Sequence, residues 1–123
     1  MSALTPPKKL SAAELLDGKT FRSTLMEVIN YLKSLRSEVN EALRATKDIL
    51  QVHFLIRQFE DRLTEQGCRL SRICHSLTHQ LLTTGEVSVF EAAAELEKVL
   101  EDINELHKDW IKLKELGGGV IAD

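Results

Sequence analysis

The chain has 123 residues, of which 43% are hydrophobic and 28% are charged, and its net charge is −3. This length suits one domain that can bury a core without disulfides or metal ions. The slight acidity argues against a general nucleic-acid-binding protein, which needs a clear basic excess. No run of residues approaches the ~18 apolar positions of a membrane span, and the first residues lack the apolar stretch of a secretory signal. We therefore expect a cytoplasmic protein that binds neither nucleic acid nor membranes, with Cys68 and Cys74 as free thiols.

Residues 1–19 are predicted to form a flexible N-terminal arm, because chain termini are seldom ordered and the Pro-Pro pair at residues 6–7 interrupts regular structure. Ser11 and Glu14 fit a capping box, in which each side chain satisfies the other residue's free backbone amide. This motif predicts a short helix at residues 11–16.

A first long helix is predicted over residues 20–45, with Thr24 and Glu27 as a capping box near its start. Its apolar residues follow one another at alternating steps of three and four, which is typical of the seam of a coiled coil. This row consists of Leu25, Val28, Leu32, Leu35, Val39 and Ala42.

A middle helix is predicted over residues 48–84, after a reversal of the chain at 45–48. The apolar row that follows residue 48 is out of step with the first row, which indicates either a reversal or a local overwinding of one helix. Asp48 can cap the new helix, with Gln51 three residues later. The alternative is a single helix that continues past residue 60. The middle row consists of Ile49, Val52, Ile56, Phe59, Leu63, Leu70, Cys74, Leu77 and Leu81.

Gly67 lies inside this middle helix, where glycine costs about 1 kcal/mol and often ends a helix. The apolar row stays in phase on both sides of it, so we expect the helix to continue or to kink there. A break at Gly67 would instead produce a four-helix bundle.

The last helix is predicted over residues 88–116, because Ser88 and Glu91 fit a capping box and three consecutive glycines follow the helix. Residues 117–123 are then expected to form a flexible C-terminal tail. The main apolar row consists of Leu96, Val99, Ile103, Leu106, Trp110 and Leu113, and a second row beside it of Ala93, Leu100 and Ile111. The main row places Trp110 against the middle helix, in the core.

These elements predict an all-α protein, an antiparallel three-helix bundle with coiled-coil-like packing, because short connections make neighbouring helices antiparallel. The middle helix would be about 54 Å long at 1.5 Å per residue, so it would overhang both neighbours. The overhang needs a cover, which the short helix at 11–16, a kink at Gly67 or a second copy of the chain in a homodimer would provide.

No pattern in the sequence predicts a catalytic residue, a cofactor or a metal site. We therefore expect a non-enzymatic protein–protein interaction module, such as an adaptor, chaperone, regulator or inhibitor, that binds a protein partner through a helix face. Met26 and Phe54 are candidate partner contacts because they lie off the apolar rows. Leu100 and Ile111 are further candidates because they belong to the second row of the last helix.

The alternative function uses histidines of the middle helix. His75 and His79 lie one helical turn apart, a spacing at which two histidines can bind a metal ion, and Cys68 lies on the same face. This spacing leaves open a metal-binding helical bundle.

The same segment also resembles part of a known family. His75-Ser76-Leu77 with Gly85 is similar to the His-x-Leu-Lys-Gly…Gly stretch of histidine phosphotransfer domains, which are helical bundles of about this size. The resemblance implies a signalling protein that carries a phosphoryl group on His75. Thr78 and His79 stand where that family has the Lys that helps to hold the phosphoryl group and the Gly that leaves room around the His.

Overall fold

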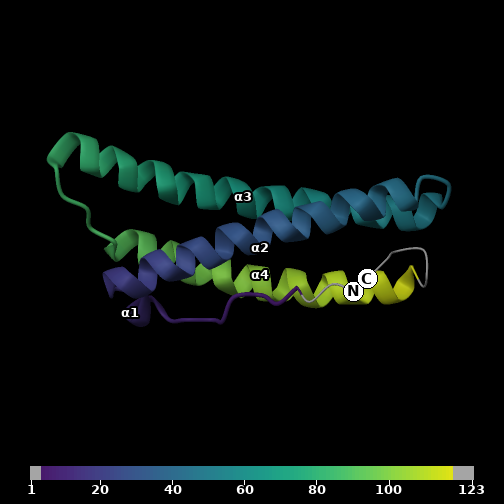
Figure 1. Cartoon of the computed structure of the whole chain (residues 1–123), viewed down its shortest axis with the longest axis horizontal. Helices are drawn as coiled ribbons and strands as arrows, with labels where there is room; N and C mark the ends of the chain where they lie inside the picture. The colour runs from purple at the N-terminus through teal and green to yellow at the C-terminus, as the bar shows by residue number, and fades with distance from the viewer. Residues whose placement is uncertain (1–3, 118–123) are drawn as a thin grey trace.

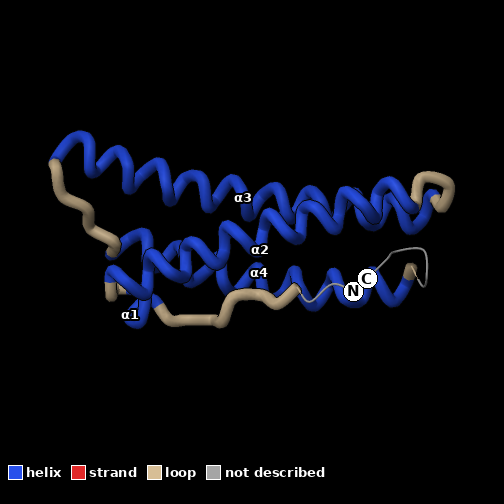
Figure 2. Tube along the Cα trace, viewed as in Figure 1, coloured by secondary structure: helices blue, strands red, loops and turns tan. Residues whose placement is uncertain are grey.

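Long antiparallel helices make up most of the structure, a computed structural model that describes residues 4–117 (Figure 1). The helices are α1 (Ala12–Leu15), α2 (Gly18–Ala45), α3 (Leu50–Thr84) and α4 (Phe90–Leu116). Over the described residues, Figure 2 shows helices and connecting loops and no strand. The expected all-α bundle is confirmed, whereas the expected tail at 117–123 lies outside the described residues from residue 118 onward.

The chain reverses between α2 and α3, and Thr46 holds this turn together. Its backbone N–H and its hydroxyl both donate to the carbonyl oxygen of Ala42, at 3.0 and 2.8 Å. Its own carbonyl oxygen accepts a hydrogen bond of 3.0 Å from the N–H of Ile49. Because Thr46 is completely buried, these bonds satisfy polar groups that water cannot reach. The expected reversal at 45–48 is present, but the expected cap is wrong: Ile49 precedes the helix, without a side-chain hydrogen bond.

Side-chain caps fix the start of α1 and of α2. The capping box of Ser11 and Glu14 is present with both of its hydrogen bonds. Asp17, and not Thr24, caps α2, and its carboxylate accepts bonds from the N–H and the hydroxyl of Thr20 at 3.1 and 2.7 Å. These two hydrogen bonds lower the pKa of Asp17, because they stabilise the charged carboxylate. The expected box at Ser88 does not open α4, which begins two residues later.

The N-terminal arm packs against the bundle over its described residues. Residues 4–11 run along the groove between α2 and α4 (Figure 1). Pro7 is buried, and its carbonyl oxygen accepts a hydrogen bond of 3.1 Å from Nδ2 of Asn104. Leu15 of α1 is fully buried, and α1 contacts α4 and α2. The expected flexible arm at 1–19 is thus a packed element where it is described, and it covers α2 and α4 instead of the α3 overhang.

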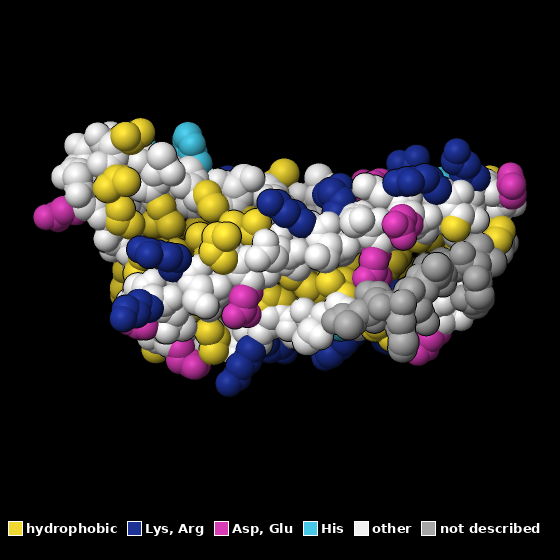
Figure 3. Space-filling model, viewed as in Figure 1, with side chains coloured by type: hydrophobic (Ala, Val, Ile, Leu, Met, Phe, Trp, Pro, Cys, Tyr) yellow, Lys and Arg dark blue, Asp and Glu magenta, His cyan; other side chains and the backbone are white. Residues whose placement is uncertain are grey.

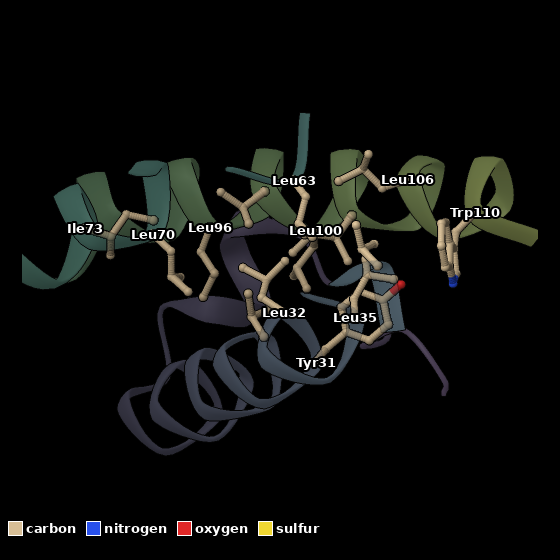
Figure 4. Packing of buried hydrophobic residues seen from close by; sticks show 14 of the residues in the cluster. Tyr31, Leu32, Leu35, Leu63, Leu70, Ile73, Leu96, Leu100, Leu106 and Trp110 are labelled. Atoms are coloured by element: carbon tan, nitrogen blue, oxygen red, sulfur yellow. The ribbon is translucent and has the colours of Figure 1, made fainter. Parts of the chain in front are cut away.

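The core runs along the axis of the bundle and draws on every helix (Figure 4). Trp110 of α4 is only 1% exposed and stacks on Phe59 of α3, with ring centroids 5.1 Å apart. Its Nε1–H donates to Oε1 of Glu38 at 3.1 Å, so the indole keeps a hydrogen-bond partner inside the core. The expected burial of Trp110 against the middle helix is confirmed. Other fully buried side chains are Leu15, Val28, Leu35, Val39, Ile56, Leu63, Leu96, Val99, Leu100, Ile103 and Leu106.

Gly67 lies within the continuous helix α3, so the alternative of a bundle broken at this residue is not realised. A Cβ atom added at Gly67 would meet no atom within 4 Å. We therefore expect Gly67→Ala to raise the free energy of unfolding by about 0.5–1 kcal/mol, because alanine restricts the unfolded chain more than glycine does.

A matched control for this prediction is Gly85, which ends α3 at a φ of +75°. An added Cβ is strained in this left-handed conformation, so Gly85→Ala should lower the melting temperature where Gly67→Ala raises it. Thermal unfolding followed by circular dichroism measures both variants. A lower melting temperature for Gly67→Ala would show that α3 is not a regular helix at this point.

Candidate functional site

The three long helices enclose three grooves, and the chain itself crosses two of them, with the N-terminal arm in one and with polar pairs in the other. The N-terminal arm occupies the groove between α2 and α4. Polar pairs bridge the groove between α3 and α4: Arg62 with Asp109 at 2.8 Å, and Arg69 with Asp102. Between and beyond these bridges remain hollows of about 430 and 340 Å³. The larger hollow has an apolar floor that includes Leu55 and Leu113, but the Arg62–Asp109 pair lies at its edge.

The third groove, between α2 and α3, opens toward one end of the molecule. Near the turn the two helices pack closely, and Arg36 of α2 still reaches Oγ1 of Thr64 on α3 at 3.1 Å. Beyond this contact the helices diverge, and the end of α3 extends past the start of α4 (Figure 1). Figure 3 shows hydrophobic side chains at the surface along this opening. We call this opening the α2–α3 cleft.

One row of side chains on each helix faces the cleft. On α2, the row consists of Leu25, Ile29, Leu32 and Arg36, whose spacings of four, three and four residues place them on one side of the helix. The Arg36–Thr64 contact shows that this side faces α3. On α3, the same steps run from Leu70 to Leu81. Leu70 is buried, whereas the members nearer the open end are partly or largely exposed. The side chains that line the cleft are Leu25 and Ile29 of α2 and Cys74, Leu77 and Leu81 of α3.

The cleft is apolar and only half covered. Leu25, Ile29 and Leu77 are partly buried against the core. Leu81 is 54% exposed, and the neighbouring Leu82 is 79% exposed. Counting outward from the Arg36–Thr64 contact, Ile29 lies level with residue 71 and Leu25 level with residue 75. The two apolar rows therefore face each other near Cys74, and Leu77 and Leu81 lie farther toward the open end. Contiguous exposed apolar surface of this kind usually marks an interaction site.

A second cluster of functional groups lies between α2 and α4. The hydroxyl of Tyr31 lies 2.9 Å from Nδ1 of His107, and Glu38 accepts from both Trp110 and Lys114. Burial lowers the pKa of His107 and raises the pKa of Tyr31, because it disfavours the charged form of each. Both groups are therefore neutral at pH 7 and hydrogen-bonded to each other. This cluster joins two helices, and Tyr31 also lines a hollow of about 470 Å³ between α2 and the N-terminal arm.

The structure does not bring the four predicted partner contacts together. Met26 is 51% exposed and lies next to Ile29 at the solvent edge of the cleft. Phe54 is 62% exposed near the α2–α3 turn, and Ile111 is 40% exposed on α4, on the side that carries Asn104 and His107. Leu100 is fully buried in the core, so this residue is not accessible to a partner. The broad apolar face of α4 is instead covered by α2, α3 and the arm.

His75 and His79 are both exposed on the outer side of α3, away from the core. Cys68 is a free, exposed thiol two turns before His75. Within residues 4–117, no three His, Cys, Asp or Glu side chains are grouped so that they could hold a metal ion. Thr78, which stands at the place of the family's lysine, donates its hydroxyl to the carbonyl oxygen of Cys74.

Comparisons of the chain with known proteins assign no function to the cleft. No family model matches the chain, and no curated protein or solved structure is detectably similar to it. Among the described residues, no helix is long and apolar enough to cross a membrane.

Sequence analysis missed Ile29, identified the other cleft residues and placed them in the core. Leu25 belongs to the first apolar row and Cys74, Leu77 and Leu81 to the middle row, and neither row changes character where the helices diverge. The one signal in the sequence was length, because a middle helix longer than its neighbours must leave part of its apolar row uncovered.

Proposed function

We propose that this protein is a non-enzymatic interaction module that holds an amphipathic helix of a protein partner in the α2–α3 cleft. The supporting observation is the contrast among the three grooves. The arm lies in one and leaves hollows of about 470 and 360 Å³ against α2, and polar pairs bridge the second. The third exposes an apolar row on each of its two walls. The two free thiols of the protein, Cys68 and Cys74, suit a reducing compartment such as the cytoplasm.

A helix is the occupant that this geometry favours. Two helices that diverge from a turn leave a wedge-shaped space, and a further helix packed into it would complete a four-helix arrangement. The partner needs apolar residues at i, i+3, i+4 and i+7, the spacing with which a helix lays its apolar face into a groove. The α3 wall, from Leu70 to Leu81, extends for about 11 residues, which corresponds to about 16 Å or three turns of such a helix.

Cys74 makes this proposal measurable, because it lies within the cleft. Cys68 lies on the same helix but is exposed on a different side, so it serves as an internal control. The probe is a synthetic helical peptide of about 16 residues, with leucines at the spacing given above and uncharged polar residues elsewhere. We expect the peptide to slow alkylation of Cys74 several-fold and to leave the rate at Cys68 unchanged.

Two substitutions distinguish the cleft from the surface near the turn. Leu77→Asp places a charge inside the cleft and should abolish protection of Cys74 by the peptide, because a charge buried without a partner is costly. Phe54→Asp changes an exposed residue at the other end of α3 and should leave protection intact. If Phe54→Asp abolished binding and Leu77→Asp did not, the cleft would be rejected as the binding site. Equal alkylation rates of Cys74 with and without the peptide would also reject it.

A homodimer is the competing way to cover the same surface, and light scattering at micromolar concentration tests it. A monomer has a mass of 13.9 kDa, which is the value we expect for the free protein. A doubled mass together with slow alkylation of Cys74 in the absence of peptide would show that a second copy occupies the cleft.

A further inference from the structure

The charges around the α2–α3 cleft are distributed unevenly, in a chain whose net charge is −3. Three basic residues of α2 lie on the side of the helix that carries Ile29. Arg22 precedes Ile29 by seven residues, and Lys33 and Arg36 follow it by four and by seven. Arg22 and Lys33 are exposed. In Figure 3, Lys and Arg side chains lie along the α2 edge of the apolar opening.

Acidic groups are missing from both walls of the cleft. Residues 68–84 of α3 contain no Asp or Glu, and the two arginines of this stretch lie on the side of α4, where Arg69 pairs with Asp102 and Arg72 lines a hollow with Glu91. The first two thirds of α2, residues 18–36, contain one acidic residue, Glu27. Glu27 lies on the opposite side of α2, beside Leu4 and Lys8 of the N-terminal arm. The apolar cleft therefore has a positive rim that no acidic side chain of its own walls neutralises.

We propose that the helix bound in this cleft carries acidic residues along the edge of its apolar face that lies against α2. This inference rests on the proposed function and specifies the chemistry of the partner. Carboxylates at that edge would pair with Arg22 and Lys33, whereas a basic edge would meet like charges. Such pairing fixes the orientation and the choice of partner more than it adds affinity.

The same charges disfavour a second copy of this chain as the occupant. In a two-fold dimer through this surface, the exposed end of α3 would lie in the cleft of the other copy. That end carries no carboxylate over residues 68–84, so its edges would face Arg22 and Lys33 of the other copy without a complementary charge. An acidic helix from another protein has no such conflict.

Three peptides test the inference, and they share one leucine row but differ at the residues that flank it. The flanking positions are glutamate in the first, glutamine in the second and lysine in the third. We expect the glutamate peptide to bind about tenfold more tightly than the glutamine peptide, which corresponds to about 1.4 kcal/mol, and the lysine peptide to bind most weakly. The difference should shrink at about 1 M salt, because salt screens exposed charges.

A charge-reversed variant and a matched control identify the rim. The double variant Arg22→Glu and Lys33→Glu should reverse the order of the three peptides. The double variant Arg44→Glu and Lys47→Glu changes the net charge by the same amount at exposed positions near the turn, so it should leave the order unchanged. Binding is measured by the alkylation rate of Cys74 and by peptide anisotropy.

Each outcome decides between the inference and the function on which it rests. Equal binding of the three peptides, with Cys74 protected by each, would overturn the acidic partner and leave the helix-binding function standing. Tighter binding of the lysine peptide would also overturn it. No protection by any peptide would reject both proposals. Protection of Cys74 by vesicles of anionic lipid, but by none of the peptides, would assign the positive rim to a membrane surface and overturn the inference.

Discussion

Trp110→Ala should lower the free energy of unfolding by about 3–5 kcal/mol, which is the cost of removing a fully buried large aromatic side chain. Trp110 is 1% exposed, stacks on Phe59 at 5.1 Å and donates a hydrogen bond to Glu38. The substitution therefore leaves a cavity between α3 and α4 and also removes a donor from Glu38. A loss of this size is a large part of the about 5–15 kcal/mol that stabilises a typical domain.

Two further variants separate packing from hydrogen bonding at this position. Trp110→Phe keeps an aromatic ring against Phe59 but removes the donor, so it should cost less than Trp110→Ala. Ile111→Ala changes the next residue of α4, which is 40% exposed, and should cost well below about 2 kcal/mol, since that side chain has less contact to lose.

Urea unfolding followed by circular dichroism gives these free energies. The fluorescence of Trp110, the only tryptophan of the chain, reports its burial directly. A red-shifted emission in the folded protein, with a loss below about 1 kcal/mol for Trp110→Ala, would place the indole at the surface and contradict the core described here.

The order and extent of the helices follow from local patterns, so the sequence predicted them well. Apolar rows at steps of three and four define each helix face, and Thr83-Thr84-Gly85 marks the end of α3. The reversal before α3 was predicted from a change in the phase of the apolar row. Its physical cause was less visible, because buried Thr46 closes the turn through its hydroxyl and Asp48 does not take part in the cap.

The cleft could not be predicted, because its shape depends on the angle between two helices. The row from Leu70 to Leu81 has the same residue types and spacing where it is buried and where it is exposed. Only the relative direction of α2 and α3 decides which of these leucines contact a neighbouring helix. Sequence patterns give the face that a helix buries but not how far along the helix its neighbour stays in contact.

The N-terminal arm shows the opposite error, because a segment that was expected to be mobile is packed against the bundle. Its composition indicated a mobile segment, because Pro6-Pro7 excludes a regular helix and termini are often poorly ordered. An extended segment can nevertheless pack if its backbone finds partners. Asn104 supplies one for Pro7, and Glu97 supplies one for the N–H of Ala12, at 3.0 Å. Neither contact is visible in the sequence, since each joins residues more than 80 positions apart.

The arm leads to the second large effect that we expect. Deletion of residues 1–16 should lower the free energy of unfolding by about 2–5 kcal/mol, comparable with truncation of one fully buried leucine. Leu15 is completely buried, and Leu4 and Leu10 pack against the core, so the deletion uncovers apolar surface on α2 and α4. The loss stays moderate because an arm that is absent no longer has to be ordered on folding. Asp17 remains in this variant, so α2 keeps its cap.

Two adjacent leucines show whether this stability comes from packing of the arm. Leu15 is fully buried and Leu16 is 45% exposed, although both belong to the same turn of chain. Leu15→Ala should cost about 2–5 kcal/mol, and Leu16→Ala less than about 1 kcal/mol, in urea unfolding. Equal and small effects of the two substitutions, together with an unchanged stability of the chain that lacks residues 1–16, would show that the arm is not docked in solution. The groove between α2 and α4 would then be open as well, and the α2–α3 cleft would no longer be distinguished by being the groove that the chain leaves unfilled.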